Sequence, residues 1–217
     1  MSRVSGLPRR GRATAIAALL SASMVMFAQD AAAQARPAAA PAAQPPRAPA
    51  RAPMRTMTLT SPDFTDGGAI PAMFAQPGHD VSPALSWSGV PDSTRSFVLI
   101  VHDADAPMGD GLDDMLHWMV WNIPGTATSL PRGVPQGPMR DGMRQISVSG
   151  PYYRGPAAPS TGPAHHYVFE LYALDVPITV PATGMSPAAT REAVMRAMAQ
   201  HVRGKGVLTG TYRRPAP

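Results

Sequence analysis

Three short runs of β-branched, aliphatic and aromatic residues constrain the fold of this chain more than any other feature. They cover residues 96–102, 117–123 and 167–174, and residues that favour loops or turns follow each run. Stretches rich in proline and glycine, without helical periodicity, lie between them. The pattern predicts a mainly β protein with antiparallel sheets, because helical segments between the strands are scarce.

One helix is expected near the end of the chain. Ser186 is a suitable N-cap, and Pro187 fits the first helical position. Apolar residues then repeat every four positions before Gly204: Val194, Met198 and Val202. This stripe should pack on a sheet, and residues 207–212 should form a final short strand.

The first 55 residues predict two segments outside the folded domain. Residues 1–35 combine arginines, an apolar run and small residues in the order typical of a cleaved secretory signal, and the apolar run is short for a membrane anchor. Residues 36–55 are almost entirely alanine, proline and arginine, which predicts a disordered tether. Residues 56–217 should form one domain, periplasmic or secreted, with no transmembrane segment after signal removal.

The net charge of +5 misrepresents the domain, because basic residues gather near the N-terminus. Eight of the nineteen precede residue 56, which leaves eleven basic against thirteen acidic residues in the domain. A nucleic-acid-binding domain usually carries a basic stripe, so nucleic acid is not an expected partner. The chain has no cysteine, which fits an exported protein without disulfides and excludes a lipid anchor on an N-terminal cysteine.

Polar residues at the ends of the apolar runs form the candidate site. Asp103 and Asp105 follow the first run, and Pro107 fixes the backbone where a loop should begin. Residues two apart on an extended chain point the same way, so both carboxylates could face one pocket. His117 opens the second run, and a carboxylate beside its imidazole would favour the charged ring, a donor suited to phosphate oxygens.

The second half of the candidate site comes from residues 155–167. His165 and Tyr167 are two apart at the start of the third run, so both rings could enter one pocket, whereas His166 should point the other way. Gly155 would permit close approach to a ligand, and Pro156 would stiffen its segment. Each residue alone is more often structural, but together they predict a small anion pocket.

The order and spacing of these segments resemble the phosphatidylethanolamine-binding protein family, in particular its bacterial branch named after the Raf kinase inhibitor protein. Residues 103–107 resemble the family's Asp-x-Asp-Ala-Pro signature, and Gly155 and His165 share its spacing of ten residues. The resemblance implies a large and a smaller antiparallel sheet with a C-terminal helix and few peripheral helices, and a cavity that accepts phosphate-like anions. The chain departs from the family pattern at Ala158, usually proline, and His166, usually arginine.

Three functions are compatible with these residues. The first is a non-catalytic protein without a cofactor that binds a phosphate-bearing small molecule or a phospholipid head group, with His117, His165 and Tyr167 as donors. The second is a metal-assisted hydrolase with Asp103, Asp105, His117 and His165 as ligands, although the chain lacks a compact metal motif. The third, implied by the resemblance, is a protein-binding inhibitor of an envelope protease.

Overall fold

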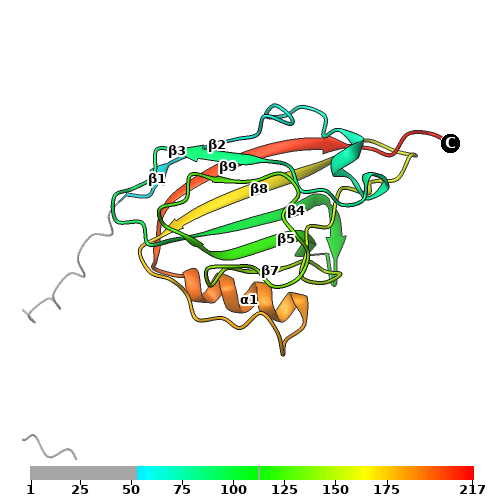
Figure 1. Cartoon of the computed structure of the whole chain (residues 1–217). Helices are drawn as coiled ribbons and strands as arrows, with labels where there is room; N and C mark the ends of the chain where they lie inside the picture. Colours follow the sequence, from blue (N-terminus) through cyan, green and yellow to red (C-terminus); the bar gives the residue numbers. More distant parts are fainter. Residues whose placement is uncertain (1–52, 112) are drawn as a thin grey trace, which may run out of the picture. The chain divides into compact units, whose positions relative to one another are not determined.

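Two β-sheets and one α-helix make up the part of the chain that the computed structural model describes, residues 53–111 and 113–217 (Figure 1). The larger sheet has six strands in the order β1-β9-β8-β4-β5-β7. The bounds are Arg55–Thr56 for β1, Val202–Tyr212 for β9, His165–Leu174 for β8, Ser96–Met108 for β4, Asp113–Pro124 for β5 and Arg144–Ile146 for β7. The expected signal and the tether up to residue 52 lie outside the described residues.

The smaller sheet has three antiparallel strands in the order β2-β3-β6. They are Thr58–Thr60, Leu85–Ser88 and Ser129–Leu130. In the larger sheet every pairing is antiparallel except that of the two-residue edge strand β1, which runs parallel to β9. The expected mainly β fold with a large and a smaller sheet is therefore confirmed, but the large sheet is mixed rather than purely antiparallel.

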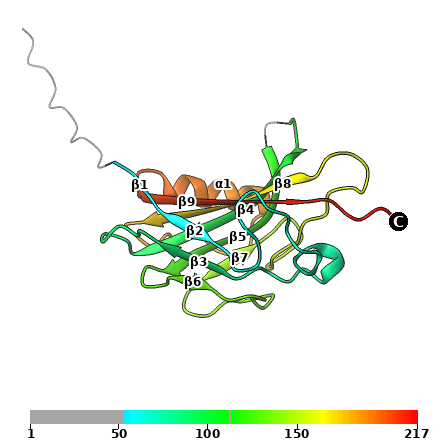
Figure 2. The ribbon, with the colours of Figure 1, turned by 90° about the horizontal axis from the view of Figure 1, so that it is seen from above.

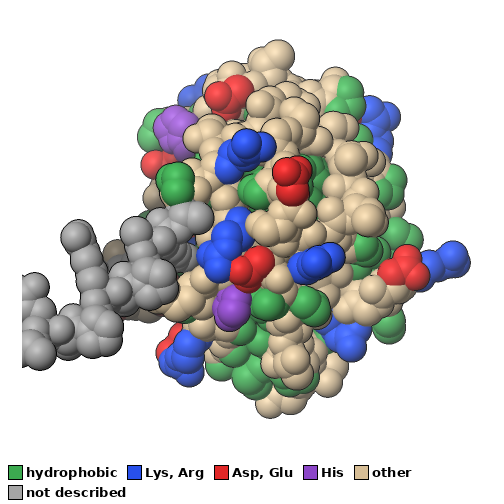
Figure 3. All heavy atoms as spheres, turned by 90° about the vertical axis from the view of Figure 1, so that its left-hand side faces the viewer, with side chains coloured by type: hydrophobic (Ala, Val, Ile, Leu, Met, Phe, Trp, Pro, Cys, Tyr) green, Lys and Arg blue, Asp and Glu red, His purple; other side chains and the backbone are tan. Residues whose placement is uncertain are grey.

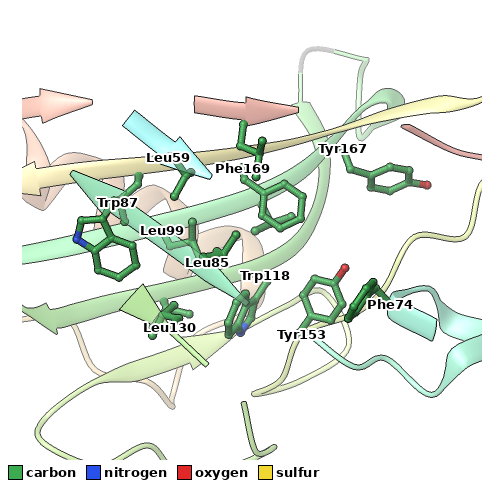
Figure 4. Close-up of a cluster of buried hydrophobic side chains, with 14 of the residues drawn as sticks. Leu59, Phe74, Leu85, Trp87, Leu99, Trp118, Leu130, Tyr153, Tyr167 and Phe169 are labelled. Carbon is green, nitrogen blue, oxygen red and sulfur yellow. The ribbon is translucent and has the colours of Figure 1, made fainter. Parts of the chain in front are cut away.

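The large sheet is covered on both faces. Figure 2 shows the smaller sheet on one side and α1, Pro187–Met198, on the other. Alternate residues of β4 consequently serve two cores: Phe97, Leu99 and Val101 pack toward the smaller sheet, in the cluster of Figure 4. Val98 and Ile100 pack toward α1. A strand buried on both faces must be apolar at nearly every position, which explains the dense runs in the sequence.

Helix α1 begins as expected and ends earlier. The Ser186 side chain accepts a hydrogen bond from the Ala189 N–H, and Val194 and Met198 are buried against the sheet. Gln200 adopts a left-handed conformation with φ of 72°, so the helical path stops before Val202. Val202 instead opens β9 and still packs on the same core. The final strand is therefore longer than the expected 207–212.

Different elements form the two ends of the domain. Strand β1 lies at one end of the long axis, and the 3₁₀ helices η1, Ala72–Phe74, and η2, Gln76–Gly78, lie at the other with the C-terminus (Figure 1). The β1 end shows basic and acidic side chains intermingled (Figure 3). No helix in residues 53–111 and 113–217 is long and apolar enough to cross a membrane.

Candidate functional site

Strands β4, β5 and β8 carry four of the expected site residues to one end of the large sheet. Asp103 on β4 is the register partner of Tyr167 on β8, and His165 lies two residues before Tyr167 on the same face. The His117 ring on β5 meets the Tyr167 ring edge-on, with 5.0 Å between the centroids. Residues up to 64 positions apart in the sequence, Asp103 to Tyr167, thus share one neighbourhood.

A buried carboxylate orients His165. Asp103 is 3% exposed, and its Oδ1 and Oδ2 lie 3.2 and 2.9 Å from Nδ1 of His165. The same carboxylate accepts the backbone N–H of Asp105 at 3.0 Å. With Nδ1–H directed at Asp103, Nε2 is the His165 nitrogen left for another partner, as an acceptor in the neutral ring or a donor in the charged ring.

His117 has a different partner from the one expected. Its Nδ1 donates to the Arg154 carbonyl at 2.7 Å rather than to a carboxylate. The ring is 1% exposed, and burial lowers the pKa of His117, opposed by the Arg154 carbonyl and the Asp103 charge. His117 is therefore neutral at pH 7, and its buried Nε2 is an acceptor without a hydrogen-bond partner among the described residues.

Tyr167 holds the site together and is not a free donor. Its hydroxyl oxygen accepts the backbone N–H groups of Ala157 at 3.2 Å and Ala158 at 3.1 Å. Burial raises the pKa of Tyr167, and the charge of Asp103 and a hydrogen bond with it raise it further, so the phenol stays protonated. The expectation that Tyr167 donates to a phosphate is replaced by a role as a bridge between β8, Asp103 and the 157–158 backbone.

Gly155 and Pro156 fix a loop rather than face a ligand with free backbone groups. The Gly155 N–H donates to Oδ1 of Asp80 at 2.8 Å, and the Pro156 carbonyl accepts from the Gln76 N–H at 3.0 Å. A Cβ at Gly155 would lie 2.6 Å from the Phe74 carbonyl oxygen. Glycine is therefore required for close packing of this loop against η1 and η2, not for the approach of a ligand.

Asp105 and Pro107 leave the pocket that the sequence predicts for them. Asp105 Oδ2 accepts from Nδ1 of His166 at 2.8 Å and from the His166 N–H at 2.6 Å, and these bonds lower the pKa of Asp105. The Asp105 side chain is 43% exposed and the His166 side chain is 57% exposed. The β4–β5 register shifts between Asp103 and Pro107, so side chains beyond Asp103 no longer alternate regularly between the two faces of the sheet. Pro107 is exposed and is the register partner of Asp114 in the β4–β5 hairpin. His166 points away from His165, as expected.

Tyr153 is a candidate site residue that the sequence reasoning missed. It is 2% exposed and packs edge-on against Trp118, with 5.6 Å between ring centroids, beside Phe74 (Figure 4). Burial raises its pKa, and the charge of Asp80 raises it further, so the phenol is neutral. Its hydroxyl is buried without a hydrogen-bond partner among the described residues. Its position two residues before Gly155 is the signal that could have suggested it.

The site offers hydrogen bonds more readily than metal ligands. Nε2 of His117 and the Tyr153 hydroxyl are available, next to a His165 ring oriented by Asp103. Asp105 is turned to His166, so the four-ligand set expected for a hydrolase does not assemble. Within residues 53–111 and 113–217, no group of three His, Cys, Asp or Glu side chains is placed to hold a metal ion.

Two hollows lie elsewhere on the domain. One of about 500 Å³ runs beside β7, and one of about 650 Å³ lies between the β4–β5 hairpin and α1. Neither is lined by His117, Tyr153, His165 or Tyr167. No described residue that lines them carries a buried polar side-chain atom without a partner, whereas the end of the sheet has such atoms on His117 and Tyr153. Unsatisfied buried polar groups call for a partner, which favours the sheet end as the binding site.

Comparisons with known proteins agree with this fold and residue pattern. Residues 60–213 match the family model described as phosphatidylethanolamine-binding protein. A UPF0098 protein of Methanothermobacter thermautotrophicus is 41% identical over 161 residues, 73% of this chain and 99% of the relative. The chain belongs to the phosphatidylethanolamine-binding protein family, as the sequence resemblance indicates.

Two solved structures place the chain in the same fold. A phosphatidylethanolamine-binding protein homologue of Chlamydia trachomatis has a TM-score of 0.61 and 32% identity, covering 73% of this chain and 98% of the other. Escherichia coli YbcL, described as a member of the mammalian family, has a TM-score of 0.60 and 27% identity with the same coverage. The shared fold therefore spans nearly the whole of each solved chain.

Proposed function

We propose that this chain is an exported, non-catalytic binding protein that takes a phosphate-bearing small molecule or a phospholipid head group at the end of its large sheet. The observation that carries the proposal is the pair of buried polar atoms without partners, Nε2 of His117 and the hydroxyl of Tyr153, beside the Asp103–His165 pair. Buried polar groups are nearly always hydrogen-bonded, so a ligand or water completes them.

A phosphate group matches the chemistry of these atoms. The Tyr153 phenol is a donor, and the charged form of His165 donates through Nε2 while Asp103 balances its charge. Neutral His117 accepts at Nε2, which suits the P–OH of a singly protonated phosphate; after protonation it donates instead. A phosphate monoester, which has both acceptor oxygens and a titratable hydroxyl, therefore satisfies all three side chains. The diester of a phospholipid head group has no P–OH and fits the site when His117 is protonated and donates.

The proposed role is binding without chemistry. The phenols of Tyr153 and Tyr167 have raised pKa values and are poor nucleophiles at neutral pH, and the Asp103 carboxylate is already hydrogen-bonded to His165 and to the Asp105 N–H. The name of the matching family model, phosphatidylethanolamine-binding protein, supports binding of a head-group-like ligand. The periplasmic or secreted location rests on the signal-like residues 1–35.

Calorimetric titration tests the proposal with three probes: inorganic phosphate, phosphorylethanolamine and ethanolamine. We expect the two phosphate compounds to bind and ethanolamine to bind far more weakly, because only the phosphate addresses His117, Tyr153 and His165. Equal binding of ethanolamine would shift the recognised group to the amine. No binding of either phosphate compound at millimolar concentration would overturn the proposal.

A further inference from the structure

Strand β7 is an edge of the large sheet, and its outer side has no strand beside it. The strand order places β7 next to β5 alone, with Gln145 as the register partner of Val120 (Figure 1). In an antiparallel pair, the N–H and C=O groups of alternate residues point away from the neighbouring strand. Within residues 53–111 and 113–217, no backbone hydrogen bond joins residues 144–146 to a segment other than β5. β7 therefore offers backbone groups to a further strand.

The hollow of about 500 Å³ beside β7 runs across this edge, because its lining residues belong to both faces of the sheet. Met139 and Met143 pack against the core that the large sheet shares with the smaller sheet. Ile146 and Ala182 belong to the core on the other face, under α1. A hollow bounded by residues of both cores must lie along the edge that separates the two faces. An occupant of the hollow would therefore lie beside the backbone of β7.

Arg144 is the only charged residue that lines the hollow. Its Nη1 donates to the carbonyls of Gly142 at 3.1 Å and Met143 at 3.2 Å, and no described carboxylate lies within 4.0 Å of its guanidinium. The nearest charged residues in the sequence, Arg140 and Asp141, are opposite in sign, so Arg144 gives this part of the chain a net positive charge. The rest of the lining is mainly apolar and includes three prolines: Pro138, Pro151 and Pro181.

We propose that this hollow, which we call the β7 slot (residues 137–139, 143–146, 150–151 and 181–183), binds an extended peptide segment that pairs with β7 and places an acidic side chain on Arg144. Addition of a strand to a free sheet edge supplies main-chain hydrogen bonds, and side-chain contacts supply specificity. A carboxylate is the group that a guanidinium without an acidic partner binds best. Three paired residues span roughly 10 Å, and the volume of the slot lies in the range of about 300–1,000 Å³ that ligand sites have.

A single extended segment fits the β7 slot better than a second copy of the chain. Residues 137–139 and 181–183 border the slot from the two faces of the sheet. The β7 strand of another domain is bordered in the same way, so these segments of the two domains would meet before the strands did. A peptide has no such borders, and it needs only the spacing of neighbouring strands, about 4.8 Å, to pair with β7.

Nitrogen-15 NMR of the full mature chain tests the slot, because amide shifts locate the contact. The probe is a capped five-residue peptide of valine and threonine with a central glutamate. We expect saturable shifts at the amides of residues 143–146. Binding should be about two- to fivefold weaker when lysine replaces the glutamate. A peptide methylated at every backbone nitrogen should not bind, because it cannot donate to a strand edge.

Variants of the chain test the two parts of the proposal separately. Arg144→Ala should remove the preference for the glutamate peptide over the lysine peptide. Arg95→Ala is the matched control, because it removes an exposed arginine that does not line the slot, and the preference should remain. Thr183→Trp adds a large ring at an exposed position of the slot lining and should abolish the shifts at residues 143–146. Dispersed amide signals outside the slot show that this variant is folded.

Several results would contradict the assignment of the slot. They are the absence of saturable shifts at residues 143–146 with the glutamate peptide at millimolar concentration, equal binding of the methylated peptide, and equal binding of the lysine peptide by the unaltered chain. A dimer in analytical ultracentrifugation that Thr183→Trp dissociates would assign the slot to a second copy instead of a peptide. These results do not depend on the phosphate site, because His117, Tyr153 and His165 do not line the slot.

Discussion

His117 and His165 share one site but are held by opposite kinds of partner. The Asp103 carboxylate accepts a hydrogen bond from Nδ1 of His165 and can balance a positive charge on that ring. A neutral backbone carbonyl, that of Arg154, accepts from His117, and burial disfavours the charged ring. At the scale of single residues, the site therefore pairs one histidine suited to donate to an anion with one suited to accept from it.

Replacing His165 tests the donor role. His165→Ala should weaken phosphorylethanolamine binding by about 1.5–3 kcal/mol, the scale of a hydrogen bond to a charged group. His166→Ala is the matched control, because that ring pairs with exposed Asp105 on the other side of the strand and should change affinity little. Calorimetry on both variants measures the difference, and an equal loss in His166→Ala would contradict the assignment.

The buried, neutral state of His117 predicts a pH dependence of stability. Its pKa is lowered in the folded protein from 6.5, so as the pH falls through that value the unfolded chain takes up a proton that the folded chain does not. This residue therefore destabilises the fold progressively as the pH falls from 6.5 toward the lowered pKa. Urea unfolding at several pH values should show a smaller loss on acidification for His117→Asn, and an unchanged loss would refute the prediction.

At the scale of elements, Gly155 joins the site loop to the η1–η2 segment. A Cβ there would lie 2.6 Å from the Phe74 carbonyl oxygen, and the other atoms that it would meet belong to the Ala75 backbone. Because backbone atoms cannot move aside as a flexible side chain can, Gly155→Ala should destabilise the fold by about 1–3 kcal/mol. Gly109→Ala is the control, since its Cβ would meet nothing within 4 Å and only its left-handed φ of 59° is unfavourable. Urea unfolding should rank Gly155→Ala as the more destabilising; the reverse order would contradict the packing role.

Helix α1 is attached to the large sheet by one narrow apolar stripe. Val194 is fully buried and Met195 is 45% exposed, although they are adjacent in the sequence. Val194→Ala should cost roughly 1–3 kcal/mol of unfolding free energy through a core cavity, whereas Met195→Ala should cost under about 0.5 kcal/mol. Thermal unfolding of both variants checks this, and similar losses would show that the helix packs differently.

The elements that the sequence predicted are those with strong local signals. The three dense apolar runs became β4, β5 and β8, and Ser186 with Pro187 marked the start of α1. The two-residue strand β1 has no such signal, because it exists only through pairing with β9. The extension of β4 to Met108 depends likewise on the partner strand β5, so the expected loop after Asp103 is part of a hairpin.

The candidate site, like the fold, could be predicted from the sequence only where neighbouring residues carry the signal. Positions at strand ends were enough to predict that Asp103, His117, His165 and Tyr167 converge. The register shift after Asp103, which sends Asp105 to His166, is set by strand pairing and cannot be derived from alternation alone. The Arg154 carbonyl that holds His117 and the burial of the Tyr153 hydroxyl arise from loop packing, which leaves no periodic signal in the sequence.

At the scale of the whole molecule, the domain should be independent of the residues that precede it. Residues 36–52 contain only alanine, proline, arginine and glutamine, so they offer no large apolar side chain to the core. Deleting them from the mature chain should change the melting temperature by less than about 2 °C. A large drop would mean that this segment contributes to the folded domain.

The N-terminal residues carry a prediction about export. The order of basic, apolar and small residues in 1–35 predicts cleavage between residues 28 and 36 and a product outside the cytoplasm. N-terminal sequencing of protein from its native envelope measures this. A mature protein that retains Leu19 and Leu20 would contradict the signal assignment.

The central claim is that a phosphate group completes the polar atoms of His117, Tyr153 and His165. Nitrogen-15 NMR of the six histidines during titration with phosphorylethanolamine tests it most directly, because each ring nitrogen reports its own protonation and hydrogen bonding. The account predicts saturable shifts at Nε2 of His117 and of His165, and almost none at His166 or His201. Shifts confined to the exposed histidines, or no shift at His117 and His165 at millimolar ligand, would contradict it.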